Sequence, residues 1–176
     1  ANTFVIGWLI EEITGMPFQD VLTKEIWRNI GAEGDASMLA PRYGVPVTDG
    51  GLLARLRDVA RFGLLFTPSY SVVTSRKIIS DRHLNLILEG GNPDLLRNTR
   101  YGGWVSNDIK HNVYQWDSVF KNNDMYKGGW GGQGLLVNPE HDLVTVYTGY
   151  FKKDQSEVRL LGMLRTILDE LYGVAE

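Results

Sequence analysis

The sequence predicts an α+β protein in which helices come first, an antiparallel sheet follows, and one helix closes the chain. Three observations carry this prediction. Apolar residues recur with helical spacing over much of residues 4–90, short runs rich in β-branched and aromatic residues follow from residue 101, and an apolar stripe with helical spacing returns after residue 154. Because glycine, asparagine and aspartate separate the short runs, the strands are expected to pair as antiparallel neighbours.

Two helices are expected at the start of the chain. Residues 4–13 place apolar side chains every three or four positions, and Gly15 stands where this helix ends. Pro17 suits the first turn of a second helix, whose apolar side runs to Ile30 and which stops at Gly31.

Two more helices are expected after an irregular excursion. Residues 32–51 show no clear period and contain glycine, proline, aspartate and serine, a composition typical of loops that build binding sites or cover a core. Helical spacing returns over residues 53–66. A short helix then begins at Ser80 and ends at Gly90.

The remaining elements are strands and a closing helix. Strands are expected around Trp104 and over residues 113–116, 125–127, 133–137 and 143–150. The last two flank residues 138–142, whose length and composition suit a hairpin loop. Asp154 then opens a helix with an apolar stripe from Val158 to Leu171, and this stripe needs a sheet face to cover.

Composition excludes several classes of function. The chain has 18 basic and 21 acidic residues in an interleaved pattern, so no basic face for nucleic acid or acidic lipid is predicted. It has no cysteine, which excludes disulfides and thiolate chemistry, and its apolar runs fall far short of the roughly 18 residues of a membrane span. No nucleotide-binding glycine loop is present in the right context. We therefore expect no cofactor.

The histidines and tryptophans give weaker signals. No pair of histidines has metal-ligand spacing, so no metal site is predicted, and a surface or loop position is expected for all three, which are His83, His111 and His141. Periodic apolar neighbours place three tryptophans in core or half-buried positions, namely Trp8, Trp27 and Trp104.

The segment most unusual for a strand region is the glycine-rich run that follows Lys127. Its glycines are Gly128, Gly129, Gly131, Gly132 and Gly134. Glycines weaken a sheet unless something approaches the backbone closely, so a lysine followed by bare peptide groups can hold an anionic or acyl substrate and aim N–H groups at an oxyanion. The alternative is a glycine-rich hairpin turn with an exposed lysine.

Lys127-Gly128-Gly129, on a strand before a hairpin and a C-terminal helix, resembles the Lys-Thr-Gly box of the serine β-lactamase and penicillin-binding protein superfamily. Residues 131–144 (Gly-Gly-Gln-Gly-Leu-Leu-Val-Asn-Pro-Glu-His-Asp-Leu-Val) are similar to the segment after that box in the branch of class C β-lactamases, esterases and 6-aminohexanoate-dimer hydrolases. Three further strings resemble this branch, namely residues 2–15, 49–52 and 57–63.

The resemblance implies a β-lactamase/transpeptidase-like fold and a serine hydrolase that forms an acyl-enzyme on an ester, amide or β-lactam bond. Lys127 would bind a substrate carboxylate or polarise the proton-transfer network. Gly129 would allow the substrate to approach the backbone closely, and the peptide N–H of Trp130 would stabilise the oxyanion. Gly128 and Gly131 would border the substrate. An indole that closes one end of the sheet is the structural alternative for Trp130.

The family's Ser-x-x-Lys and Tyr-x-Asn motifs would both lie before Ala1. The 176 residues would then be the C-terminal portion of a single domain, with a mainly helical part over residues 1–95 and strands plus a helix over residues 96–176, and the fold would be incomplete without its N-terminal part. The chain alone is expected to be inactive. A catalytically silent binding or interaction domain is the alternative, since Gly128 replaces the family's hydroxyl residue.

Ser118-Val119-Phe120-Lys121 matches Ser-x-x-Lys literally, but it lies in strand-like sequence, where alternation separates Ser118 from Lys121. We therefore do not expect Ser118 to be a nucleophile. Without the family's N-terminal strands, a sheet edge and part of the last helix would be uncovered. The expected partners are a small-molecule substrate and either the missing N-terminal segment or a second copy of the chain.

Overall fold

A computed structural model describes residues 2–97, 108–150 and 156–173. The helical elements are α1 (Asn2–Thr14), α2 (Phe18–Glu25), the 3-10 helix η1 (Trp27–Asn29), α3 (Leu56–Leu64), the 3-10 helix η2 (Pro68–Val72), α4 (Asp81–Glu89), α5 (Pro93–Arg97) and α6 (Ser156–Tyr172). The strands are β1 (Ser37–Met38), β2 (Leu52–Leu53), β3 (Ile109–Val113), β4 (Trp116–Phe120), β5 (Met125–Gly129), β6 (Gln133–Asn138) and β7 (Leu143–Thr148). The predicted α+β class is confirmed.

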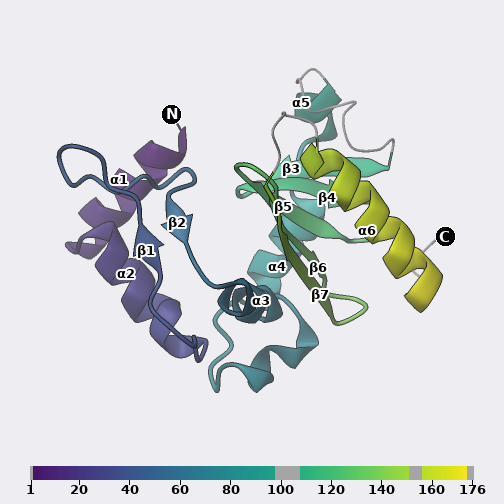
Figure 1. Cartoon of the computed structure of the whole chain (residues 1–176), viewed down its shortest axis with the longest axis horizontal. Coiled ribbons are helices and arrows are strands. Elements are labelled where there is room, and N and C mark those ends of the chain that lie inside the picture. The colour runs from purple at the N-terminus through teal and green to yellow at the C-terminus, as the bar shows by residue number, and fades with distance from the viewer. Residues whose placement is uncertain (1, 98–107, 151–155, 174–176) are drawn as a thin grey trace.

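A five-stranded antiparallel sheet in the order β3-β4-β5-β6-β7 forms the centre of the C-terminal half. Figure 1 shows α6 lying across one face of this sheet, with α3 and α4 on its other side. Gly63 brings α3 close to the sheet, because a Cβ at this position would lie 2.7 Å from Cγ1 of Val144 and 2.9 Å from Cδ1 of Leu135. The sheet is therefore the middle layer of three.

Strand alternation divides the core into two clusters. Met125, Leu135 and Val137 point toward α3 and α4, and they pack with Phe66 and Ile87. The intervening residues of the strands point toward α6, where the cluster consists of Phe120, Tyr126, Leu136, Leu161 and Leu168. The predicted cover of a sheet face by the closing helix is confirmed.

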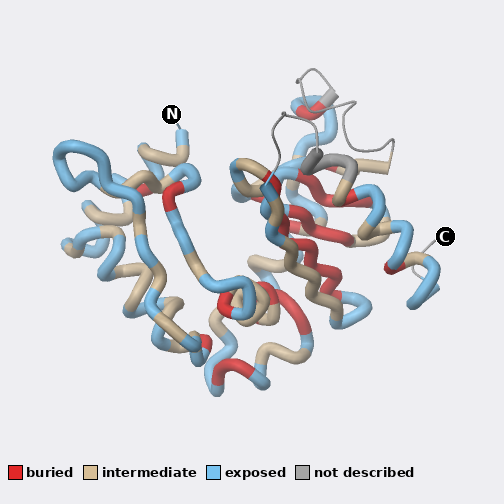
Figure 2. The backbone as a smooth tube through the Cα atoms, viewed as in Figure 1, coloured by how far each residue is buried: buried red, intermediate tan, exposed pale blue. Residues whose placement is uncertain are grey.

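The first two helices stand apart from this core. Figure 2 shows the buried residues gathered in the sheet and around α3, whereas α1 and α2 are mostly exposed or half-buried. Gly7 is the buried residue of α1, packed against Thr48. Along the opposite side of α1 runs an exposed apolar stripe, made of Val5, Ile6, Leu9 and Ile13.

Local signals placed most of the helix ends correctly. Gly15 ends α1 with a φ of 64°, and the Ser80 hydroxyl caps α4 by accepting the His83 N–H. The second helix is shorter than predicted, since α2 ends at Glu25 and the chain continues as η1 before the buried Ile30. Leu53, the predicted start of the next helix, belongs to β2, which pairs with β1 inside the predicted irregular segment, and α3 begins at Leu56.

The strand predicted over residues 113–116 is wrong. Val113 pairs with Trp116, and the two residues between them, Tyr114 and Gln115, have φ of 48° and 68°. Two consecutive positive φ values form the tight hairpin turn whose twist matches that of the flanking strands. Glycine and asparagine usually mark such turns, so their absence here hid the turn between β3 and β4.

Two tryptophan predictions have different outcomes. Trp27 is half-buried as predicted, and its indole N–H donates to the Gly34 carbonyl at 2.9 Å. The prediction for Trp8 is wrong, because Trp8 is 58% exposed on α1. Trp104 and the predicted helix start at Asp154 lie outside the described residues.

None of the helices described here is long and apolar enough to cross a membrane.

Candidate active site

Lys127 lies on β5, the middle strand of the sheet. Successive side chains of a strand point to opposite faces of the sheet. Tyr126 points toward α6 and Met125 toward α3 and α4, so the side chain of Lys127 projects on the same side as Met125. The side chain is half exposed, and its Nζ lies 2.7 Å from Oδ1 of Asp117 on β4.

Asp117 carries no signal that singles it out in the sequence. Its Oδ1 accepts a hydrogen bond from Lys127, and its Oδ2 accepts one from the Gly128 N–H at 2.8 Å. The two strands pair at Ser118 with Tyr126, so continuing this register places Asp117 opposite Lys127. A correct β4–β5 register would have revealed the pair, but the strand predicted over residues 113–116 ends before Asp117.

The glycines after Lys127 have different structural reasons. At Gly128, a Cβ would lie 3.0 Å from the Tyr126 hydroxyl, which in turn lies 2.9 Å from the Tyr147 hydroxyl. At Gly134, a Cβ would lie 2.3 Å from the Tyr147 ring. At Gly129, it would lie 2.9 Å from Cβ of Gln133, the paired residue on β6. These close approaches come from the protein's own side chains.

The hairpin between β5 and β6 carries the remaining candidates. Gly129 pairs with Gln133, and the turn between them includes Gly131 and Gly132 with φ of 87° and 111°, a region that favours glycine. Trp130 opens this turn with its side chain 96% exposed. The indole therefore does not close the sheet, and the peptide group of Trp130 directly follows the strand that carries Lys127.

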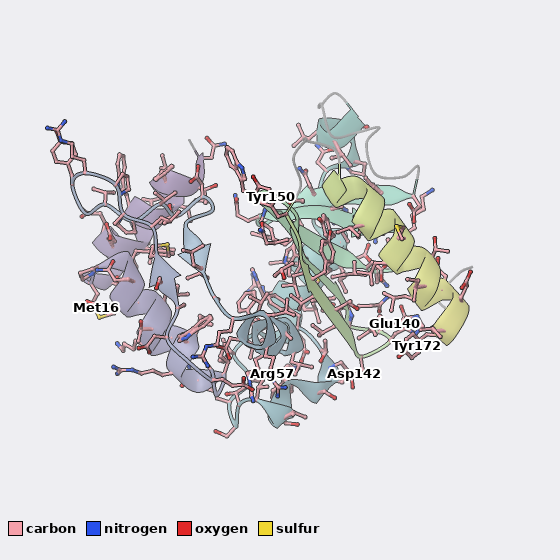
Figure 3. All side chains as sticks on the ribbon, viewed as in Figure 1. Met16, Arg57, Glu140, Asp142, Tyr150 and Tyr172 are labelled. Carbon is pink, nitrogen blue, oxygen red and sulfur yellow. The ribbon has the colours of Figure 1, made fainter. Side chains whose placement is uncertain are left out.

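The end of β7 lies beside this glycine turn. Gln133 pairs with Thr148, the last residue of β7, so the start of β6 and the end of β7 share one end of the sheet. Figure 3 labels Tyr150 at this end of β7 and Asp142 at the opposite end, where β6 turns into β7. The candidate residues thus gather at one end of the sheet.

The opening helix reaches the neighbourhood of β4. The Thr3 hydroxyl near the start of α1 donates to Oε1 of Gln115 at 3.0 Å, in the turn that precedes β4. The Thr3 carbonyl accepts a hydrogen bond from the Thr48 hydroxyl at 3.2 Å. A small cavity of about 10 Å³ lies between α1 and residues 45–48, and Lys127 is not among its lining residues.

Ser118 has the surroundings of a structural residue. It lies within β4, is 4% exposed and pairs with Tyr126 on β5. Lys121 follows the end of the strand and is exposed. The expectation that this Ser-x-x-Lys string lies in a strand is confirmed, and the string does not open a helix.

The three histidines divide between surface and core. His83 lies in α4, with its ring 5.1 Å from that of Tyr114, and His141 is exposed in the β6–β7 hairpin loop. The prediction of a surface or loop position for His111 is wrong. It is buried within β3, and its Nε2 lies 2.8 Å from the Ile87 carbonyl. Among the described residues no group of acidic residues and histidines could hold a metal ion.

No protein-family model matches the chain. Over 146 residues, which are 83% of the chain, it is 26% identical to the 6-aminohexanoate-dimer hydrolase of Paenarthrobacter ureafaciens, and the match covers 37% of that protein. A solved structure from Bacillus anthracis, described as a candidate 6-aminohexanoate-dimer hydrolase, superposes with a TM-score of 0.69 and 20% identity over 98% of this chain and 43% of that one. The chain spans less than half the length of both proteins.

These similarities confirm the resemblance to the branch that includes the 6-aminohexanoate-dimer hydrolases, and they confirm the α+β fold.

Proposed function

We propose that this chain forms part of a serine hydrolase that cleaves an ester, amide or β-lactam bond through an acyl-enzyme. The observation that carries the proposal is the position of Lys127, which lies on the middle strand, on the side of α3 and α4. The strand ends two residues later at a turn that has open space beside Gly131. Similarity to a named hydrolase over 83% of the chain supports it. Because that relative's name specifies an amide dimer, a linear amide is a fitting substrate.

The proposed reaction has two steps. A serine hydroxyl attacks the substrate carbonyl, its proton passes to the leaving group, and the bond to the leaving group breaks. Water then hydrolyses the acyl-serine. In this scheme the peptide N–H of Trp130 donates to the oxyanion, and the open space beside Gly131 leaves room for the acyl group. Lys127 binds a substrate carboxylate or polarises the proton-transfer network.

The serine belongs to polypeptide outside these 176 residues, in a Ser-x-x-Lys motif followed by a Tyr-x-Asn motif. In this proposal the chain is the C-terminal portion of a single β-lactamase-like domain, and the rest of the domain covers the exposed apolar stripe of α1. Exposed apolar stripes of this kind are typical of surfaces that another polypeptide covers. A second copy of the chain is the alternative cover.

Active-site labelling tests the proposal. The whole natural protein should react with a fluorophosphonate or penicillin probe at a serine outside these residues, whereas the 176-residue chain alone should not react. Labelling of the isolated chain at Ser118 would overturn the assignment of the nucleophile.

A matched pair of lysine variants then tests Lys127 in the whole protein. Lys127→Met should lower kcat/KM by about 100-fold or more, in line with the loss of a positioned polar group in an active site. Lys110→Met is the control, since Lys110 lies on β3 and pairs with Glu89. Equal activity of the two variants would contradict the role of Lys127.

A catalytically silent binding domain is the second candidate function. It is favoured by Gly128, which lacks the hydroxyl of the resembling family's box, and by the pairing of Lys127 with Asp117. This candidate predicts that the whole protein binds small amides or esters without turnover and carries no reactive serine.

A further inference from the structure

Asp117 joins the lysine and the backbone of the candidate site through one carboxylate. Oδ1 lies 2.7 Å from Lys127 Nζ, and Oδ2 lies 2.8 Å from the Gly128 nitrogen. Hydrogen bonds that involve an ionised group are shorter and stronger than neutral ones. The same carboxylate thus bridges the ammonium group and the peptide that follows it.

The arrangement lies directly beyond the end of the β4–β5 ladder. The last paired residues of the two strands are Ser118 and Tyr126. Trp116, at the start of β4, points into the core, where its ring lies 5.2 Å from that of Phe66. Beyond the last pair, the Gly128 N–H donates to the Asp117 side chain instead of a carbonyl of β4. A side chain thus takes the place of a strand partner at the edge of the candidate site.

The pair also removes the charge that a substrate would meet. Asp117 and Lys127 together carry no net charge, and both side chains are about half exposed, at 44% and 47%. A carboxylate that approaches Nζ also approaches the Asp117 carboxylate a few ångströms away, so attraction and repulsion nearly cancel. One of the three donors of the ammonium group is already used.

We propose that Asp117 is a specificity-determining residue that masks Lys127, so that the site takes substrates whose group beside Lys127 is uncharged. The inference rests on the proposed hydrolase function, and it decides between the two roles of Lys127. The ammonium group polarises the proton-transfer network and does not anchor a substrate carboxylate.

Two matched esters test this in the whole natural protein. 4-Nitrophenyl valerate and mono-4-nitrophenyl glutarate have acyl chains of equal length and differ in a terminal methyl or carboxylate. The wild type should prefer the valerate ester by 10-fold or more in kcat/KM. Asp117→Asn keeps an oxygen for the Gly128 N–H, and it should shift this preference toward glutarate by 10-fold or more through a lower KM for the glutarate ester.

Glu89→Gln is the control, because Glu89 also pairs with a strand lysine, Lys110, and its loss changes the net charge equally. This variant should keep the wild-type preference within twofold. A preference in Asp117→Asn that also stays within twofold of the wild type would overturn the inference.

A binding measurement separates failure of the inference from failure of the proposed function. If neither ester is hydrolysed and no serine is labelled, the hydrolase proposal fails. Glutarate binding, followed at the Gly128 amide by NMR, should still be at least 10-fold tighter in Asp117→Asn than in the wild type, and equal binding would refute the masking of Lys127.

Should Asp117→Asn fail to fold, the salt dependence of glutarate binding to the wild type tests the masking of Lys127 instead. Between about 20 and 500 mM salt the Debye length falls from roughly 20 Å to roughly 4 Å, so attraction to an unmasked ammonium group would weaken steeply. A change in affinity under twofold over this range supports masking, and a steep loss overturns it.

Discussion

Arg165 on α6 donates from Nε to Oδ2 of Asp124 at 3.0 Å, and Asp124 is 3% exposed next to β5. The same guanidinium donates to both oxygens of Asp108, and its Cζ lies 3.9 Å from the centre of the Phe120 ring. Burial by itself lowers the pKa of Arg165, but the hydrogen bonds and charges of Asp108 and Asp124 outweigh it and hold this pKa above its ordinary value. One side chain therefore ties α6 to the sheet.

Removal of this arginine should destabilise the chain strongly. Arg165→Met leaves Asp124 buried without its charged partner, which costs about 3–5 kcal/mol in the free energy of unfolding. Arg57→Met is the control, because the exposed Arg57–Glu33 pair contributes at most about 1 kcal/mol. Urea unfolding followed by circular dichroism measures both. Losses that agree within about 1 kcal/mol would show that Arg165 acts as a surface residue.

The hairpin that joins β6 and β7 should respond to acid. Asp142 accepts hydrogen bonds from the Ser69 hydroxyl and the Ser69 N–H, and chiefly the hydroxyl holds the pKa of Asp142 below its ordinary value. A depressed folded-state pKa gives stability that is present above the unfolded pKa of 3.8 and is lost as the pH falls through the folded value.

Ser69→Ala should therefore reduce the loss of stability between about pH 5 and pH 2, and the effect should be small because the site is exposed. Ser71→Ala in the same 3-10 helix is the control. Unfolding midpoints measured across this pH range compare the three proteins. If the unfolding midpoints of Ser69→Ala and the wild type change identically with pH, Ser69 is not the cause of the lowered pKa of Asp142.

A double-mutant cycle should give a coupling free energy between the buried His111 and Gly91. A Cβ at Gly91 would lie 2.2 Å from Cδ2 of His111, so Gly91→Ala should cost about 1–3 kcal/mol through overpacking. The same substitution in a His111→Ala background should cost clearly less, since the obstructing ring is gone. Thermal unfolding of the four proteins gives the coupling energy.

Gly162→Ala provides the control for this cycle. Gly162 lies in α6, and a Cβ added there would have nothing within 4 Å, so alanine should stabilise the helix by about 0.5–1 kcal/mol. Equal costs of Gly91→Ala with and without the His111 ring would contradict the close contact.

The exposed stripe of α1 should make the isolated chain associate. Val5, Leu9 and Ile13 lie one turn apart on the exposed side of α1, so we expect concentration-dependent self-association in sedimentation. Leu9→Glu should shift the chain toward the monomer, whereas Leu95→Glu on α5 should not, because Leu95 is exposed away from this stripe. A wild-type chain that stays monomeric at all concentrations would contradict this prediction.

Much of the fold could be predicted from the sequence, but less of the candidate site. Lys127 was predicted on a strand before a hairpin, and β5 and the glycine turn have that position. Asp117 was missed because its role depends on which residues of β4 and β5 lie opposite each other. That register is set across residues 121–124, where the Asn123 N–H donates to the Phe120 carbonyl, and local preferences did not specify it.

The sequence by itself determined the broad order of helices, then an antiparallel sheet, then a closing helix, together with the stop of α1 at Gly15, the cap of α4 at Ser80 and the apolar stripe of α6. Each of these depends on the conformational preferences of neighbouring residues or on a period along one helix. Only the tertiary structure decided that Lys127 pairs with Asp117, that His111 is buried and that Trp8 is exposed. The physical reason is that pairing across strands and burial depend on which distant segments pack together, and local preferences do not specify this.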